Sequence, residues 1–314
     1  MSTGRPAPPP AAAGAAGAAI EVREGLTAAQ AAAVLHLIEQ AASADGIAPL
    51  SEQGMLHVRH GGNRDVRDFL LLCGGQLAGY AQLDPAAGYT AELVIDPAFR
   101  RRGLGRALAE VLTAQAEGRD LRVWSHGDLP AAARLAAAAG FERSRSLWQM
   151  RAPLAAPIAA PRLAEGIAVR PFQVGHDEDA WVTLNATAFA AHPEQGDWTR
   201  ADLELREREA WFDPAGFFLA DRGIRLAGFH WTKIHPAQGA AEPIGEVYVV
   251  GVDPAERGTG LGRALTLIGL RYLRDRGLRE VLLYVDESNV AAVRLYESLG
   301  FTRWSADIMF RRGR

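Results

Sequence analysis

The stretch ELVIDPAFRRRGLG, residues 92–105, returns in modified form as VVGVDPAERGTGLG, residues 249–262. Each copy joins an apolar run typical of a buried strand, an Asp-Pro pair, and an Arg-x-x-Gly-x-Gly turn that leads into a helical pattern. A second pair, AAGF ending at Phe141 and SLGF ending at Phe301, repeats at nearly the same spacing. We therefore expect a tandem repeat of one structural unit.

The length of the chain agrees with two such units. At roughly 150 residues per domain, 314 residues correspond to about two domains. The start of the chain is rich in Pro, Ala and Gly, and a second proline-rich stretch lies near its middle. The expected organisation is a disordered tail at 1–19, an amino-terminal domain at 20–152, a linker at 153–166 and a carboxy-terminal domain at 167–314.

Local patterns predict the same order of elements in both halves. Thr27 is placed to cap a helix that runs to about Ala42, and two strands about a glycine turn are expected in 69–83 and again in 217–233. Apolar residues recur at helical spacing after each Arg-x-x-Gly-x-Gly turn, and strands follow at 121–126 and 281–287. These patterns predict an α/β fold in which helices flank a mixed β-sheet in each domain.

Composition excludes several classes of partner. A net charge of −3 argues against nucleic acid or an anionic membrane as the main partner. The sequence contains no apolar run of 18 residues and only one cysteine, Cys73, which we expect to be buried and inert. We expect a soluble, cytoplasmic, monomeric protein without disulfides.

The glycine turn suits a phosphate group. Neither copy has the Gly-Lys-Ser/Thr of a P-loop, and Leu108 and Leu265 occupy the place of the third glycine of a dinucleotide fingerprint. Glycines let the backbone amides converge, and a helix start carries about half a positive charge, so a pyrophosphate can bind there. For one copy alone a simple tight connection remains the alternative.

Each half resembles a GNAT-type acyltransferase domain, and NVAAVRLYESLGF (289–301) matches the last helix and strand of that family. The resemblance implies two tandem acyl-CoA N-acyltransferase domains that use acetyl-CoA and no metal. The implied cofactor-binding residues of the first half are Leu93, Val94, Ile95, Arg101, Arg102, Gly103, Leu104, Gly105 and Arg106. Those of the second half are Val250, Gly251, Val252, Arg257, Gly258, Thr259, Gly260, Leu261, Gly262, Arg263, Asn289, Val290, Ala291, Ala292, Val293 and Arg294.

A narrower resemblance is to the mycothiol synthase family of actinobacteria. It is carried by AAHPEQGDW (190–198), EAWFDPAG (209–216), GFHWTKIHP (228–236), GEVYVVGVDP (245–254) and LLYVDESNVAAVRLYESLGF (282–301). This resemblance implies acetylation of the cysteinyl amine of cysteinyl-glucosaminyl-inositol. The implied substrate contacts are Glu52, Glu194, Lys233, Glu246 and Tyr284, and for Glu52 and Lys233 a solvated surface charge remains the alternative.

Aligning the sequences of the two copies indicates which half catalyses. Glu246 and Tyr296 correspond to Tyr89 and Ala136, and Asn289 corresponds to Leu129. A carboxylate can take a proton from an amine nucleophile, and a phenol can protonate a leaving thiolate. We therefore expect Glu246 and Tyr296 to be the catalytic base and acid, and the first half to bind acetyl-CoA without catalysing. A solvated strand residue and a core aromatic are the alternative interpretations.

Three other possibilities remain open at this point. The histidines of the second half, His192, His230 and His235, suggest a metal site, but no Cys or Asp stands at ligand spacing beside them. A GNAT enzyme for another amine, such as an antibiotic, a polyamine or a protein N-terminus, has the same turns. A non-enzymatic acyl-CoA sensor would also have these turns, although it needs neither Glu246 nor Tyr296.

Overall fold

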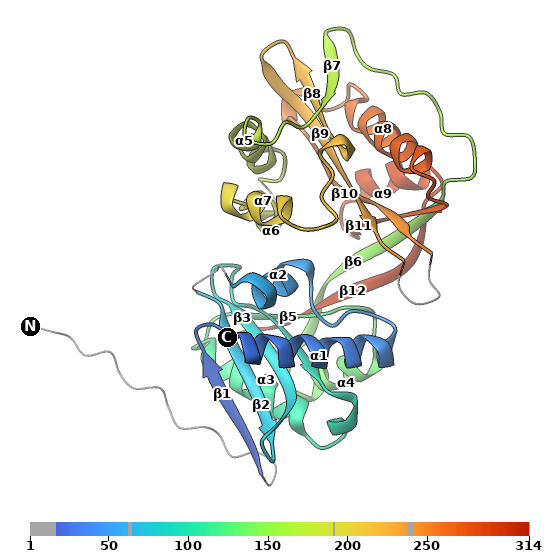
Figure 1. The fold of residues 1–314 in the computed structure, drawn as a ribbon. Coiled ribbons are helices and arrows are strands. Elements are labelled where there is room, and N and C mark those ends of the chain that lie inside the picture. The colour runs from blue at the N-terminus through green and yellow to red at the C-terminus, as the bar shows by residue number, and fades with distance from the viewer. Residues whose placement is uncertain (1–16, 62–64, 191, 238–241, 314) are drawn as a thin grey trace, which may run out of the picture. The chain divides into compact units, whose positions relative to one another are not determined.

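The computed structural model describes residues 17–61, 65–190, 192–237 and 242–313, and for 193 and 194 it describes the backbone alone. The chain forms two compact units. Unit 1 comprises the residues up to Ser146 together with Ala306–Arg314, and unit 2 comprises Leu147–Ser305. Figure 1 shows strands flanked by helices in each unit.

Unit 1 is built on one mixed sheet. Its strands lie in the order β1, β2, β3, β4, β5 and the last residues of β12, and only β4 and β5 run parallel. Its elements are β1 (Ala18–Arg23), α1 (Ala28–Asp45), α2 (Glu52–His60), β2 (Arg67–Cys73), β3 (Gln76–Asp84), β4 (Thr90–Ile95), the 3-10 helix η1 (Pro97–Phe99), α3 (Leu104–Gln115), β5 (Leu121–Ser125) and α4 (Pro130–Ala138).

Unit 2 repeats this plan. The last residues of β6 are followed by β11, β10, β9, β8 and β7, and only β10 and β11 run parallel. Its elements are β7 (Ile167–Pro171), α5 (Glu178–Ala188), α6 (Pro193–Gly196), α7 (Arg200–Glu207), the 3-10 helix η2 (Pro214–Gly216), β8 (Phe217–Arg222), β9 (Arg225–His235), β10 (Ile244–Val252), the 3-10 helix η3 (Pro254–Glu256), α8 (Leu261–Asp275), β11 (Glu280–Asp286) and α9 (Val290–Glu297).

The two halves of the sequence exchange their last strands. Strand β6 (Glu142–Pro153) follows the first repeat, yet residues 147–153 pair with β11 in unit 2. Strand β12 (Thr302–Arg312) follows the second repeat, yet residues 308–312 pair with β5 in unit 1. The compact units are therefore not consecutive stretches of chain, in contrast to the ranges 20–152 and 167–314 expected from the repeat.

In both units the helix after the glycine turn packs on one face of the sheet through a glycine. A Cβ at Gly79 in β3 would lie 3.4 Å from Leu108 of α3, and one at Gly228 in β9 would lie 2.9 Å from Leu265 of α8. The next strand residue points to the opposite face, where Tyr80 joins the core under α1. Helices therefore cover both faces of each sheet, as expected.

Most of the elements expected from the sequence are confirmed, with two corrections. Thr27 caps α1 in a capping box with Gln30, and the glycine hairpins form β2–β3 and β8–β9. The strand β1 takes in Ala18 and Ala19, which composition had placed in the tail; residues 1–16 of that tail lie outside the described part of the chain. Cys73 ends β2 and is only partly buried, because the strand stops there at an exposed hairpin.

Candidate active site

The two glycine turns have matching backbone geometry. Positive φ angles occur at Arg101 (64°) and Gly103 (82°) in unit 1, and at Gly258 (79°) and Gly260 (84°) in unit 2. Gly103 and Gly260 are the N-cap residues of α3 and α8, and without a side chain they accept no hydrogen bond from the first-turn amides. In unit 2 the amide of Leu261 donates to Thr259 Oγ1 at 3.4 Å. The remaining first-turn amides can bind an anion, so both turns fit a pyrophosphate.

Beside each turn the parallel strand pair separates. The pairing of β4 with β5 ends at Glu92, while β4 continues to Ile95. The pairing of β10 with β11 ends at Val247, while β10 continues to Val252. The cofactor-binding segments expected in the strands, 93–95 and 250–252, lie beyond these ends, where an extended ligand can form hydrogen bonds with the strand edge.

The arginines of the turns have different surroundings. Arg102 donates to the carbonyl of Ala98, and Arg106 pairs with Glu110, all in unit 1. In unit 2 Arg263 donates to Ser298 Oγ at 2.7 Å, whereas Arg257 is exposed. Ligand binding at Arg102, Arg106 or Arg263 would compete with these contacts, and the role of all the turn arginines in binding the cofactor remains a prediction.

The segment Asn289–Arg294, expected to bind the cofactor, forms the start of α9. Asn289 is the N-cap, and its Oδ1 accepts a hydrogen bond from the amide of Ala292 at 3.2 Å. The corresponding residue Leu129 provides no side-chain cap for α4. The side-chain amide of Asn289 therefore caps α9. Binding of the cofactor to this segment would use its backbone and the other residues of the turn.

Glu246 lies in β10 with only 7% of its side chain exposed. Its Oε2 lies 2.7 Å from Nε2 of His235, whose side chain is 37% exposed at the end of β9. A buried carboxylate held by one hydrogen-bonding partner is suited to accept a proton. Sequence patterns do not indicate this pairing, because they suggest for His235 only a metal site.

Tyr296 lies in α9 and packs against Phe301, with ring centroids 5.8 Å apart. Desolvation raises the pKa of Tyr296 to about 12. The phenol therefore keeps its proton at neutral pH and can donate it. Among the described contacts, Glu246 contacts His235 and Tyr296 contacts Phe301. None of these contacts joins Glu246 directly to Tyr296.

Strand registers correct one equivalence between the halves. In β3–β4 Asp84 pairs with Thr90, and in β9–β10 Lys233 pairs with Glu246. The pairings of β5 and β11 lead to the same alignment, so the counterpart of Glu246 is Thr90 and not Tyr89. The cause is a bulge in β10 between Val247 and Val249, which adds one residue. Unit 1 still lacks the carboxylate.

Lys233 is buried and not a solvated surface charge. Its Nζ lies 4.2 Å from the ring centre of Trp211 and 5.1 Å from that of Tyr248, the extra residue of the β10 bulge. The hydroxyl of Tyr248 accepts a hydrogen bond from Nε of the buried Arg206 at 2.8 Å. Aromatic faces stabilise an ammonium group and so hold that of Lys233 in place. Because Lys233 pairs directly with Glu246, the two side chains lie on the same face of the sheet.

The other expected substrate contacts are spread over the chain. Tyr284 in β11 is 42% exposed, and its hydroxyl accepts a hydrogen bond from Gln149 at 2.8 Å. Glu52 opens α2 in unit 1. Glu194 lies in α6, and its side chain lies outside what the structure describes. Substrate binding by these three residues remains a prediction.

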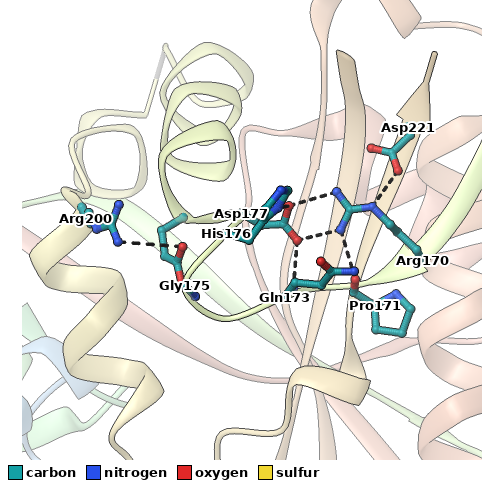
Figure 2. A network of polar contacts seen from close by, with 9 residues as sticks. Arg170, Pro171, Gln173, Gly175, His176, Asp177, Arg200 and Asp221 are labelled. Carbon is teal, nitrogen blue, oxygen red and sulfur yellow. Dashed lines mark hydrogen bonds and ion pairs between the residues drawn. The ribbon is translucent and has the colours of Figure 1, made fainter. Parts of the chain in front are cut away.

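The aromatic cluster next to Lys233, formed by Trp211, Trp231 and Tyr248, is anchored by the start of α5. Trp181 of α5 packs edge-on against Trp231 at 5.9 Å. Figure 2 shows Arg170 of β7 forming two hydrogen bonds to Asp177, at 2.6 and 3.0 Å, and one to Asp221 of β8 at 2.8 Å. Burial opposes the charge of Asp177, but hydrogen bonds from Arg170, His176 and the amide of Gln173 lower its pKa to about 2. The contacts of Arg170 attach α5 to the β7–β8 edge of the sheet.

Among the described residues no group of three or more His, Cys, Asp or Glu side chains is arranged to hold a metal ion. His230 is fully buried, its Nδ1 donates to the carbonyl of Leu265 at 2.8 Å, and burial lowers its pKa to about 4. Within the same part of the chain, no helix is long and apolar enough to cross a bilayer.

Comparisons with known proteins agree with this geometry. The Acetyltransferase (GNAT) family matches residues 181–301, and the Acetyltransferase (GNAT) domain matches residues 66–143. The chain is 61% identical to a mycothiol acetyltransferase of Thermobispora bispora over 93% of this chain and 99% of that protein. It is 56% identical to a mycothiol acetyltransferase of Thermomonospora curvata over 93% of this chain and 97% of that protein.

A solved structure has the same fold at lower identity. The tandem GNAT protein from the clavulanic acid biosynthesis pathway superposes with a TM-score of 0.68 and 22% identity, over 93% of this chain and 98% of that one. Two GNAT domains, two matching glycine turns and the identity to the curated relatives lead to one assignment. The chain belongs to the GNAT acetyltransferase family and, within it, to the mycothiol acetyltransferases.

Proposed function

We propose that this protein transfers the acetyl group of acetyl-CoA to the cysteinyl amine of 1D-myo-inositol 2-(L-cysteinylamino)-2-deoxy-α-D-glucopyranoside, which yields mycothiol and CoA. The observation that carries this proposal is the 61% identity to a curated mycothiol acetyltransferase over nearly the whole of both chains. The acceptor is inferred from that relationship, and the roles of individual residues are argued from the geometry of unit 2.

Acetyl-CoA fits unit 2 at the start of α8. The first-turn amides of α8 that follow Leu261 can hold the pyrophosphate, and the edge of β10 beyond Val247 can align the acyl arm. A backbone N–H in Val250–Val252 would polarise the thioester oxygen. When bound, acetyl-CoA supplies an activated acyl group.

The protein's own groups then move protons. Glu246 takes a proton from the substrate ammonium, which creates the nucleophilic amine. The amine nitrogen attacks the thioester carbon, and the tetrahedral intermediate loses its second N–H proton to solvent as the C–S bond breaks. The hydroxyl of Tyr296 donates its proton to the departing sulfur and regains one from solvent. The hydroxyl of Tyr296 carries its proton at neutral pH, where its pKa is raised to about 12 by burial.

The test is CoA release with acetyl-CoA and cysteinyl-glucosaminyl-inositol, compared with Glu246→Gln. We expect acceptor-dependent turnover that falls by about 10²–10⁴ in the variant. Absence of turnover by the unmodified protein, with acetyl-CoA still bound, would reject this acceptor. Full activity of Glu246→Gln would reject the base.

The substrate contacts have their own test. Lys233→Ala and Glu52→Ala should raise the acceptor KM by about tenfold or more, which corresponds to the loss of one charged hydrogen bond. The KM of acetyl-CoA should not change. An unchanged acceptor KM in either variant removes that residue from the site.

We further propose that unit 1 binds acetyl-CoA without transferring its acetyl group. Its turn has the geometry of the turn in unit 2, but Thr90 and Ala136 stand in place of Glu246 and Tyr296. Equilibrium titration should find two acetyl-CoA molecules per chain. A stoichiometry of one would contradict this proposal and leave the role of unit 2 intact.

A further inference from the structure

Acetylation of an ammonium group releases one proton for each amide formed, and that proton must reach solvent. This inference rests on the proposed function, in which Glu246 receives the proton. The side chain of Glu246 is only 7% exposed, so direct release to bulk water is restricted. The residue in contact with its Oε2 is His235, at 2.7 Å.

The strand register explains this contact. Lys233 lies directly opposite Glu246, and His235 lies opposite Ile244, two residues further along β9. Alternation along a strand puts the side chains of Lys233, His235 and Glu246 on one face of the sheet. His235 is the last residue of β9, and its side chain is 37% exposed there. It therefore connects a buried carboxylate to the solvent.

We infer that His235 is a positioning residue that orients the carboxylate of Glu246 and carries its proton to solvent. In the resting site Nε2–H of His235 donates to the carboxylate. After Glu246 has taken the proton of the amine, tautomer exchange with water places the hydrogen of the imidazole on Nδ1, the O–H bond of Glu246 breaks and an N–H bond forms at Nε2. The imidazolium then loses the Nδ1 hydrogen to water, which restores the Nε2–H tautomer and the carboxylate. Imidazole suits this step because it gains and loses protons near neutral pH.

The other charged groups around this pair are accounted for. The ammonium of Lys233 lies over the rings of Trp211 and Tyr248. His230 occupies the opposite face of the sheet, where its Nδ1 contacts the carbonyl of Leu265 in α8. Among the described contacts, His235 is thus the only imidazole that links Glu246 to solvent.

The experiment compares His235→Ala and His235→Gln with the unmodified protein in steady-state acetyl transfer. Glutamine can hydrogen-bond to Glu246 but cannot carry a proton. We expect kcat to fall about 10–100-fold in both variants, with the KM of acetyl-CoA unchanged. Added imidazole should restore part of kcat in His235→Ala, in proportion to its concentration.

The matched control is His176→Ala. His176 also pairs with a carboxylate of unit 2, Asp177 at 2.9 Å, but contributes to the anchor of α5 and not to the site. It should retain kcat and show no response to imidazole. The inference is overturned if His235→Gln keeps the unmodified kcat, or if imidazole fails to rescue His235→Ala.

A second measurement needs no turnover, so failure of the proposed acceptor can be distinguished from failure of this inference. The ¹⁵N shift of His235 Nε2 should change between unmodified and Glu246→Gln protein, while that of the His176 nitrogens should not. Equal shifts of Nε2 in the two proteins would overturn the inference whatever the acceptor. Absence of turnover with a changed Nε2 shift would reject the acceptor and support the pairing.

Discussion

Glu92 and His126 form a buried ion pair in unit 1, with Oε1 and Nε2 2.6 Å apart, and the imidazole's other nitrogen lies 3.0 Å from Asp307 of β12. Gln82 and the amide of Ser51 donate to the same glutamate. The two carboxylates raise the pKa of His126 to about 10 against the effect of burial. Burial opposes the charge of Glu92, yet its hydrogen bonds and the imidazolium lower its pKa. The exchanged strand is thereby attached to unit 1 by charge.

The stability of unit 1 should therefore depend on pH. Because the folded pKa of His126 is raised, its contribution is complete below about pH 6.5, the unfolded value, and is lost as pH rises through about 10. Glu92 also stabilises unit 1, but its pH dependence is opposite: its folded pKa is lowered, so its contribution is present above about pH 4.5, the unfolded value, and is lost on further acidification. Urea denaturation between about pH 3 and pH 10.5 measures both.

The variant that isolates this cluster is His126→Gln. It should lower the free energy of unfolding by about 3–5 kcal/mol near neutral pH, because two buried carboxylates lose their cation. Its stability should fall less between pH 7 and pH 10 than that of the unmodified protein. A parallel decline in both proteins would show that His126 does not cause the alkaline loss.

Tyr296→Phe should reduce kcat by about 10²–10³ while leaving the KM of acetyl-CoA unchanged, because only the proton donor is removed. With a pKa of about 12, Tyr296 should cause no fall in activity up to about pH 11. Tyr272→Phe is the control, since the pKa of Tyr272 is also raised to about 12, by burial and by a hydrogen bond to Asp213. Its kcat should stay near that of the unmodified protein.

Asp177→Asn should destabilise unit 2 by about 1–3 kcal/mol, because Arg170 loses a two-point partner and the buried amide cannot replace it. The folded pKa of Asp177, about 2, is below its unfolded value, so its contribution is present above about pH 4 and is lost as pH falls toward 2. Thermal unfolding at pH 7 and pH 3 tests this, and the difference between the two proteins should narrow at pH 3.

Gly269→Ala should destabilise unit 2 by about 1–3 kcal/mol through overpacking. A Cβ at this position in α8 would lie 2.0 Å from Cε1 of His230, which is fully buried. In the same helix Gly262→Ala is the control, because its Cβ would lie 3.5 Å from Val252, an ordinary contact. Thermal unfolding should rank Gly262→Ala at or above the unmodified protein and Gly269→Ala clearly below it.

Several parts of the molecule were predictable from local sequence. The repeated glycine turn, the cap at Thr27 and the glycine hairpins each depend on a few neighbouring residues, and the structure confirms them. Comparing the copies also predicted that the first half lacks a base and an acid. The substitution of Ala136 for Tyr296 holds in the structure, because Phe141 and Phe301 donate to the carbonyls of Ala136 and Tyr296 in the same way.

The sequence by itself therefore determined the repeated unit, its local elements and the half that carries Glu246 and Tyr296. Only the tertiary structure decided the exchange of β6 and β12, the equivalence of Glu246 with Thr90, and the contact of His126 with Asp307, 181 residues away. The physical reason is that local spacing predicts which face of an element is buried, whereas strand partners and bulges depend on long-range packing. The pairing of His235 with Glu246 belongs to this second class, because an eleven-residue separation indicates contact only when the register of β9 and β10 is known.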